Sequence, residues 1–281
     1  MRTGSSTNGF YGGPLLKKLV PLAHRYGIAL IAWDFPTLSD PAGDAARAAD
    51  AFHYGVDAFS PDIEEAPEGT YLTARRVAYY LSLVRKDAGS RPVIATVPRP
   101  TSLSLGTYPY AAEARFVDAF APMVYWSCTE PGAAVAVAIE ALRPLRPVVP
   151  IGQDYNMASE GGPARLPSGR EVWRFVDMAR RDGAIGVSLY DLESGGPVQL
   201  AALTDYPWQQ VAAYSSYSVP HGDVGPHQVG QRVASHRIHR YSINDRRLYK
   251  RWQLAERAQL GPAGIGWCGP WPNHSCGHGP D

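Results

Sequence analysis

Residues 56–64 read VDAFSPDIE, a short apolar segment that ends in a group of acids. Five other segments of similar length are almost continuously apolar or β-branched and are bounded by Gly, Pro or a charged residue. They are 28–35 (IALIAWDF), 92–98 (PVIATVP), 119–127 (AFAPMVYWS), 148–155 (VVPIGQDY) and 184–190 (AIGVSLY). Such segments are typical of strands that are buried on both faces of a parallel sheet.

Longer amphipathic segments separate these strands and are predicted to be helices. They are 14–26, 42–54, 70–88, 108–117, 132–144 and 168–182. Thr70 and Ser168 are predicted N-caps, and a glycine follows several of the predicted helices, as at Gly27, Gly55 and Gly183. Strands and helices that alternate with such short connections predict right-handed crossovers and an α/β architecture.

Within the α/β class we favour a TIM-type (β/α) barrel over a doubly wound open sheet. A doubly wound sheet usually carries a Gly-rich phosphate turn after its first strand, and the sequence contains neither G-x-G-x-x-G nor G-x-x-x-x-G-K-[ST]. Six strands are clear, and MRTGSS at the N-terminus has the character of a seventh. Because a TIM barrel has eight strands, we expect this barrel to lack its first one.

The composition of the chain changes near residue 214. We predict a barrel over 1–214 and a separate tail over 215–281 that is basic, rich in Gly, Pro and His, and largely disordered. The cysteines and histidines near the end of the tail match no structural zinc spacing, so no metal site is predicted there. The mixed basic and aromatic residues of 232–257 are read as a solvated helix rather than a nucleic-acid surface.

The overall composition argues against a nucleic-acid-binding protein and against a membrane-spanning one. The net charge of +1 does not favour binding to nucleic acid, and 45% hydrophobic residues can bury a sizeable core. No stretch of about 18 apolar residues predicts a membrane span. The start, MRTGSSTNGFYGG, has no apolar core of signal-peptide length. We expect a monomer with no cofactor, no metal, no membrane partner and no nucleic-acid partner.

Polar and aromatic residues collect where the predicted strands end, whereas the strand starts are plainly apolar. In α/β barrels the active groups lie at these carboxyl ends, so we interpret this end as a functional mouth. The candidate substrate-binding residues are Trp33, Asp34, Trp126, Gln153, Tyr155, Tyr190 and Asp191. For each there is a simpler alternative: an aromatic on a strand is often core packing, and an acid after a strand is often a loop cap or a solvated side chain.

Asp62 and Glu64 are the strongest candidates for catalytic residues. Side chains alternate along a strand, so these two share one face at a separation of roughly 7 Å. If that face is the barrel interior, the two carboxyls cannot both ionise easily, and one pKa must rise. The alternative is that residues 60–66 form a solvated acidic loop.

Residues 57–64 (DAFSPDIE) resemble the D-x-x-D-x-D-x-E signature on the fourth strand of family 18 chitinases, with Ser60 in place of the middle Asp. The D-x-E core also looks like the strand motif of family 25 lysozymes. Met123-Val124-Tyr125 is similar to the M-x-Y of the sixth chitinase strand, and 186–190 (GVSLY) falls where these barrels carry an aromatic floor. More broadly, residues 1–208 look like a group of actinobacterial hydrolase-like barrels.

The resemblance implies hydrolysis of an N-acetylhexosamine polysaccharide of the cell-wall or chitin type. Glu64 is expected to protonate the leaving oxygen, and Asp62 to orient the acetamide that attacks the anomeric carbon. Tyr125 would hydrogen-bond the acetamide, and Tyr190 would stack beneath the sugar. Proteins of this kind are typically exported, which implies secretion if a leader precedes the sequence.

Three alternatives stay open. Because the middle Asp is missing, the barrel can instead be a two-carboxylate hydrolase that uses Glu64 with Asp191 or Glu193 across the mouth. It can also be a carbohydrate-binding barrel that has lost catalysis. A third possibility is a non-enzymatic module in which the basic tail is the functional part.

Overall fold

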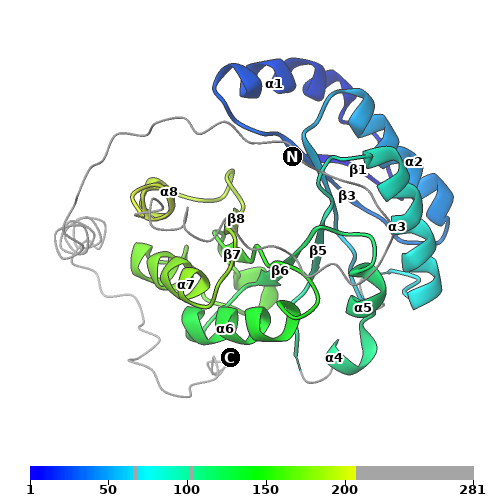
Figure 1. The fold of residues 1–281 in the computed structure, drawn as a ribbon. Helices are drawn as coiled ribbons and strands as arrows, with labels where there is room; N and C mark the ends of the chain where they lie inside the picture. The colour runs from blue at the N-terminus through cyan, green and yellow to red at the C-terminus, as the bar shows by residue number, and fades with distance from the viewer. Residues whose placement is uncertain (66, 68, 102–103, 207–281) are drawn as a thin grey trace.

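The computed structural model describes residues 1–206 apart from 66, 68 and 102–103, and the predicted tail over 215–281 lies outside the described residues. The elements follow one another along the chain as strands and helices (Figure 1). They are β1 (Arg2–Ser5), β2 (Gly9–Phe10), α1 (Gly13–Arg25), β3 (Ile31–Phe35), α2 (Pro41–His53), β4 (Ala58–Pro61), α3 (Ala74–Ala88), β5 (Ile94–Pro98), α4 (Ser104–Thr107), α5 (Tyr110–Glu113), β6 (Ala119–Val124), α6 (Pro131–Leu142), β7 (Ile151–Gln153), the 3-10 helix η2 (Ala158–Glu160), α7 (Gly169–Arg181), β8 (Ser188–Tyr190) and α8 (Pro197–Thr204).

The strands pair in the order in which they occur in the chain. Parallel ladders join β1 to β3 and β3 to β4, and others join β5 through β6 and β7 to β8. Bridges from Phe59 to Val93 and from Asp62 to Thr96 connect β4 to β5. A doubly wound sheet reverses its strand order at a switch point, whereas this order is sequential, so the barrel architecture is confirmed.

The N-terminal segment forms a strand, as MRTGSS indicated. β1 also pairs with the short β2 in an antiparallel hairpin that we did not predict. The described residues therefore contain seven parallel strands, one fewer than the eight of a TIM barrel. Figure 1 shows the helices lying outside these strands, with α1, α2 and α3 beside the first strands and α6, α7 and α8 beside the last.

Five of the six predicted helices are present with changes of a few residues at their ends. The predicted helix 108–117 is reduced to α5, and the helices α4 and α8 were not predicted. Ser168 is the N-cap of α7 and forms a capping box with Glu171, as predicted. The prediction for Thr70 is wrong, because α3 begins later and is capped by Thr73. Thr73 itself is extended, and the N–H of Tyr71 bonds to the carbonyl of Thr37 rather than within a helix.

The two faces of each strand have different roles. Phe59 packs on Phe52 of α2, and Trp126 packs on Phe175 of α7, with ring centroids 5.8 Å and 5.4 Å apart. These residues face outward, and together with the inner faces of the helices they form the main hydrophobic core. Because side chains alternate along a strand, Ser60 and Tyr125 next to them face the barrel interior. No helix in the described residues has the length and apolarity that crossing a bilayer requires.

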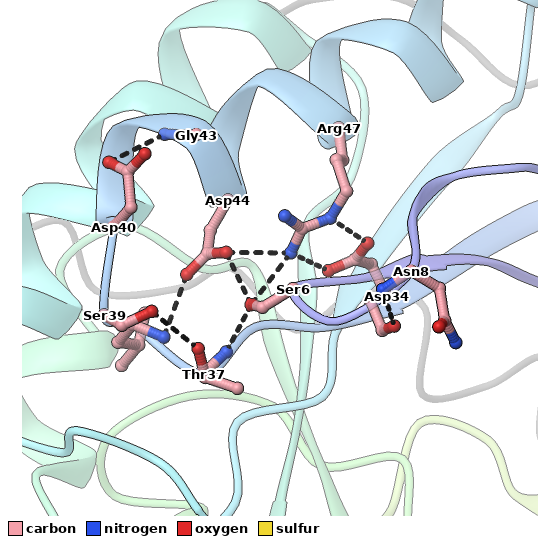
Figure 2. Close-up of polar contacts among 11 residues, drawn as sticks. Ser6, Asn8, Asp34, Thr37, Ser39, Asp40, Gly43, Asp44 and Arg47 are labelled. Carbon is pink, nitrogen blue, oxygen red and sulfur yellow. Dashed lines mark hydrogen bonds and ion pairs between the residues drawn. The ribbon is translucent and has the colours of Figure 1, made fainter.

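A buried polar network ties α2 to the loops that follow β1 and β3 (Figure 2). The guanidinium of Arg47 donates to both carboxylate oxygens of Asp34, at 2.6 and 2.8 Å, and lies 2.9 Å from Asp44. Ser6 donates to Asp44 and accepts from the N–H of Thr37. A buried Arg that binds a carboxylate at two points fixes its geometry closely, so this network sets the positions of two loops at the mouth.

Candidate active site

Asp62 and Glu64 lie at the carboxyl end of β4, with Ile63 between them. The N–H of Asp62 bonds to the carbonyl of Asp34, and that of Ile63 to the carbonyl of Thr96, so the neighbouring strands hold this backbone on both sides. The side chain of Ile63 is fully buried in the core outside the strands. By alternation, the two carboxyls on either side of it point into the barrel.

The pKa of Asp62 is raised well above the ordinary value of a carboxyl. Burial, followed by the negative charge of Glu64, raises the pKa of Asp62 to about 8, and the charge of Arg2 opposes this only in part. Its Oδ1 atom is sealed from solvent and has no hydrogen-bond partner among the described residues. A carboxyl with a pKa raised this far is mostly protonated at neutral pH.

Three tyrosines form a cluster opposite these acids. The ring of Tyr125 lies 5.5 Å from that of Tyr155 and 6.1 Å from that of Tyr190, and the last two are 5.8 Å apart. Burial raises the pKa of Tyr125, and the charges of Asp62 and Glu64 contribute to the shift. Tyr190 is 40% exposed, so the cluster reaches the surface. Residues from β4, β6, β7 and β8 thus meet at one site.

Arg2 belongs to this site although sequence reasoning did not single it out. Its guanidinium lies 5.0 Å from the ring centroid of Trp33, and its charge lowers the pKa of both Asp62 and Tyr190. A lone arginine near the start of a chain carries no functional signal in the sequence. Only the pairing of β1 with β3 brings it, together with Trp33, to the inner face.

Two predicted site residues are turned away from this cluster. Asp34 is fully buried and is paired with Arg47 on the α2 side. Trp126 is 1% exposed and packs under α7. Each follows an inward-facing residue, so the alternation that we used to group Asp62 with Glu64 also directs these two outward.

A further predicted site residue, Gln153, has an amide group that is already hydrogen-bonded to the backbone. Its Oε1 accepts from the N–H of Ser127 at 2.9 Å, and its Nε2 donates to the carbonyl of Tyr155 at 3.3 Å. The residue is buried. This geometry ties the ends of β6 and β7 together and leaves Gln153 a role in placing Tyr125 and Tyr155.

Asp191 lies at the mouth, directly after β8. Its Oδ1 accepts from the N–H of Ser194 at 2.7 Å, which makes a local turn. Burial is the main cause that raises the pKa of the neighbouring Asp154 to about 7, and the negative charge of Asp191 adds to the rise. Asp154 was visible as a strand-end acid but was not among our candidates. Its buried Oδ1 has no hydrogen-bond partner among the described residues.

No group of three or more His, Cys, Asp or Glu side chains in the part of the chain that the structure describes could hold a metal ion. The chemistry that this site can perform with its own residues is proton transfer by carboxyls beside a cluster of aromatic rings.

The pKa of Asp62 gives a first prediction. Carboxyl carbon NMR of Asp62 should show a midpoint near pH 8, well above the ordinary value of 3.8. Because the folded state holds this proton and the unfolded chain releases it at its ordinary pKa, the free energy of unfolding should fall as the pH rises between those values. Replacing Asp62 by Asn should remove that part of the pH dependence. A midpoint near 4 would contradict the buried placement.

Comparison with solved structures supports the barrel. A chitinase from Chromobacterium violaceum matches with a TM-score of 0.54 and 12% identity, over 69% of this chain and 85% of that one. A Group IV chitinase from Ostrinia furnacalis matches with a TM-score of 0.51 and 9% identity, over 75% and 89%. A GH18 chitinase from Pseudoalteromonas aurantia gives 0.50 and 13%, over 70% and 79%.

No protein-family profile and no curated sequence matches the chain. At 9–13% identity the structural matches establish the fold alone. The protein has a (β/α) barrel of the kind found in glycoside hydrolases, as the resemblance of the sequence implied.

Proposed function

We propose that the protein hydrolyses O-glycosidic bonds in a polysaccharide that contains N-acetylhexosamine, with Glu64 as the general acid. The observation that carries the proposal is the pair of carboxyls, Asp62 and Glu64, on the inner face of the barrel beside the cluster of Tyr125, Tyr155 and Tyr190. Acids that share a poorly solvated space with aromatic rings suit a sugar, which presents both hydroxyls and apolar faces.

In the proposed reaction Glu64 gives its proton to the glycosidic oxygen as the bond from that oxygen to the anomeric carbon breaks. The carbonyl oxygen of the sugar's own acetamide forms the new bond to that carbon. Water then attacks the same carbon and gives a proton back to Glu64, and the acetamide is released unchanged. Glu64 thus acts first as an acid and then as a base.

Asp62 would serve as the partner of the acetamide. Its Oδ1 receives no hydrogen bond from the residues that the structure describes, and the N–H of an acetamide could donate one. A bound donor favours the ionised form of Asp62, so binding would lower the pKa of Asp62 from about 8 and leave the proton of the pair for Glu64. The hydroxyl of Tyr125 would donate to the acetamide carbonyl, and Tyr190 would stack beneath the sugar.

The test compares two substrates that differ at one position. Matched β-linked oligosaccharides with an acetamide or a hydroxyl at carbon 2 are incubated with the protein, and new reducing ends are measured. We expect release only from the acetamide series, with a ratio of rates of at least about 100, because the hydroxyl series has no internal nucleophile. Equal release from both series would favour a second protein carboxylate, such as Asp191 or Glu193, as the nucleophile. Release from neither would reject the hydrolase.

A carbohydrate-binding barrel without catalysis is the second candidate, and Ser60 favours it. Ser60 stands where the chitinase motif has its middle Asp, and its hydroxyl donates to the carbonyl of Ile94 at 2.7 Å and lies 2.8 Å from that of Thr96. It therefore supplies no carboxyl below Asp62 to relay a proton. Saturable binding of the acetamide series in a calorimeter, with no product after long incubation, would identify this function.

A further inference from the structure

Arg2 is an exposed cation on the inner side of the barrel. It is the first residue of β1, and the three residues that follow it in the strand are buried. Gly4 faces outward, since a side chain there would begin 2.5 Å from Oδ2 of Asp34. The pairing of β1 with β3 shifts register between Arg2 and Gly4, so Arg2 lies opposite Trp33. The guanidinium therefore belongs to the interior of the barrel and not to the network on the α2 side.

The position of Arg2 relative to the acids follows from the strand pairing. Trp33 pairs with Arg2 on one side and with Ser60 on the other, so the three residues form a row across β1, β3 and β4. Asp62 is the next residue of β4 on the same face, nearer the mouth. Burial raises the pKa of both Asp62 and Tyr190, and the charge of Arg2 opposes the rise at each. The cation thus acts on both sides of the proposed sugar site.

The guanidinium of Arg2 has no carboxylate partner in the part of the chain that the structure describes, and its N–H groups donate no hydrogen bond there. It lies 5.0 Å from the ring centroid of Trp33. Arg47, by contrast, lies 2.6 Å from the carboxylate of Asp34. The contact with the indole orients the guanidinium of Arg2 and leaves its fork of N–H donors for another molecule.

We propose that Arg2 binds a carboxylate of the substrate, so that the polysaccharide carries a hexuronic acid beside its N-acetylhexosamine. The identity of the polysaccharide rests on the proposed function, whereas the binding of a carboxylate by Arg2 does not. Two parallel N–H groups of a guanidinium match the two oxygens of a carboxylate. A neutral sugar can accept from the same groups, but without the added attraction of charge.

The acids of the site explain why an acidic substrate needs this cation. Burial and the negative charge of Glu64 raise the pKa of Asp62 to about 8, so near neutral pH the pair carries one negative charge at most. That charge repels a substrate carboxylate, and the charge of Arg2 offsets the repulsion. A neutral polysaccharide meets no such repulsion.

The test compares two ligands that differ only at carbon 6 of their outer sugars. Both are thio-linked trisaccharides with a central N-acetylhexosamine, flanked on each side by a hexuronic acid in one ligand and by the corresponding neutral hexose in the other. The sulfur is a poor proton acceptor, so the ligands bind without being cleaved. Calorimetry near neutral pH and at low salt should give a Kd about tenfold lower for the acidic ligand, because hydrogen bonds between charged groups are stronger than those to a hydroxyl.

Three variants identify the group that recognises the carboxylate. In Arg2→Gln the two Kd values should agree within about twofold, because the amide has donors but no charge. Arg2→Lys keeps the charge without the planar fork and should retain a preference of about threefold. Arg75→Gln removes an exposed arginine on α3 and should keep the wild-type ratio. Because each readout is a ratio of two ligands, a change in stability or in the pKa of Asp62 cancels.

The outcomes separate this proposal from the proposed function. Equal Kd values in the wild type, the same preference in Arg2→Gln as in the wild type, or no binding of either ligand would overturn the role of Arg2. Equal Kd values in a protein that hydrolyses the acetamide oligosaccharides would leave the hydrolase in place. A preference for the acidic ligand that is lost in Arg2→Gln, in a protein that cleaves neither oxygen-linked counterpart, would support Arg2 and reject the hydrolase.

Discussion

Replacing Glu64 by Gln should lower kcat for an unactivated N-acetylhexosamine oligosaccharide by about 10³-fold, within the range of about 10² to 10⁴ that general acids contribute. The amide has the size of the carboxyl but no proton to give to the leaving oxygen. KM should change by only a few fold, because most of the contact with a sugar is expected from the tyrosine cluster and Trp33. Initial rates of reducing-end release over a range of concentrations measure both constants.

A substrate with an activated leaving group provides the internal control. A nitrophenolate leaves without protonation, so Glu64→Gln should retain much more activity on the nitrophenyl glycoside than on the oligosaccharide. Glu65→Gln is the matched variant, since it makes the same change one residue along, away from the inward-facing pair. Hydrolysis of the oligosaccharide by Glu64→Gln at the wild-type rate would remove Glu64 from the mechanism.

Replacing Arg47 by Met should destabilise the protein by about 3–5 kcal/mol, the range for breaking a buried ion pair from one side. Asp34 is fully buried and Asp44 is 2% exposed, so both would lose their cation without gaining water. Burial already raises the pKa of Asp34, and Arg47 opposes that rise. Thermal unfolding should shift downward on the order of 10 °C.

The pH dependence and a control identify the cause. Without Arg47 the pKa of Asp34 rises further, so the loss of stability should be smallest in acid and should grow once the pH passes the wild-type pKa of Asp34, which burial already holds above 3.8. The added change Asp34→Leu should recover part of the loss. Arg174→Met, which breaks a partly exposed pair with Glu130, should cost about 1 kcal/mol or less. Equal unfolding temperatures for Arg47→Met and the wild type would contradict this account of the network.

Much of the fold could be predicted because it depends on local patterns. Apolar segments of strand length between amphipathic helices can be recognised in the sequence. Ser168 could be recognised as an N-cap from its spacing to Glu171. Thr70 was misplaced because the N–H of the next residue, Tyr71, bonds to the carbonyl of Thr37 in a distant loop and so takes no part in a helix. The β2 hairpin was missed because a strand of two residues has no period to detect.

Local periodicity was sufficient to predict the alternation of strands and helices and the position of Asp62 and Glu64 on one face of a strand, because both are repeats along a single element. The sequential strand order that makes the sheet a barrel was read from the structure. The neighbours of those two acids could be identified only from the three-dimensional structure. In that structure Arg2 lies over Trp33 at the site, and Asp34 pairs with Arg47. Trp126 packs against Phe175 in the core, and the Tyr108 hydroxyl donates to the carbonyl of Ile63. The burial of a side chain and the charges around it depend on residues that are distant in the sequence. A local sequence pattern does not contain the information on which strands and helices will meet at a given place.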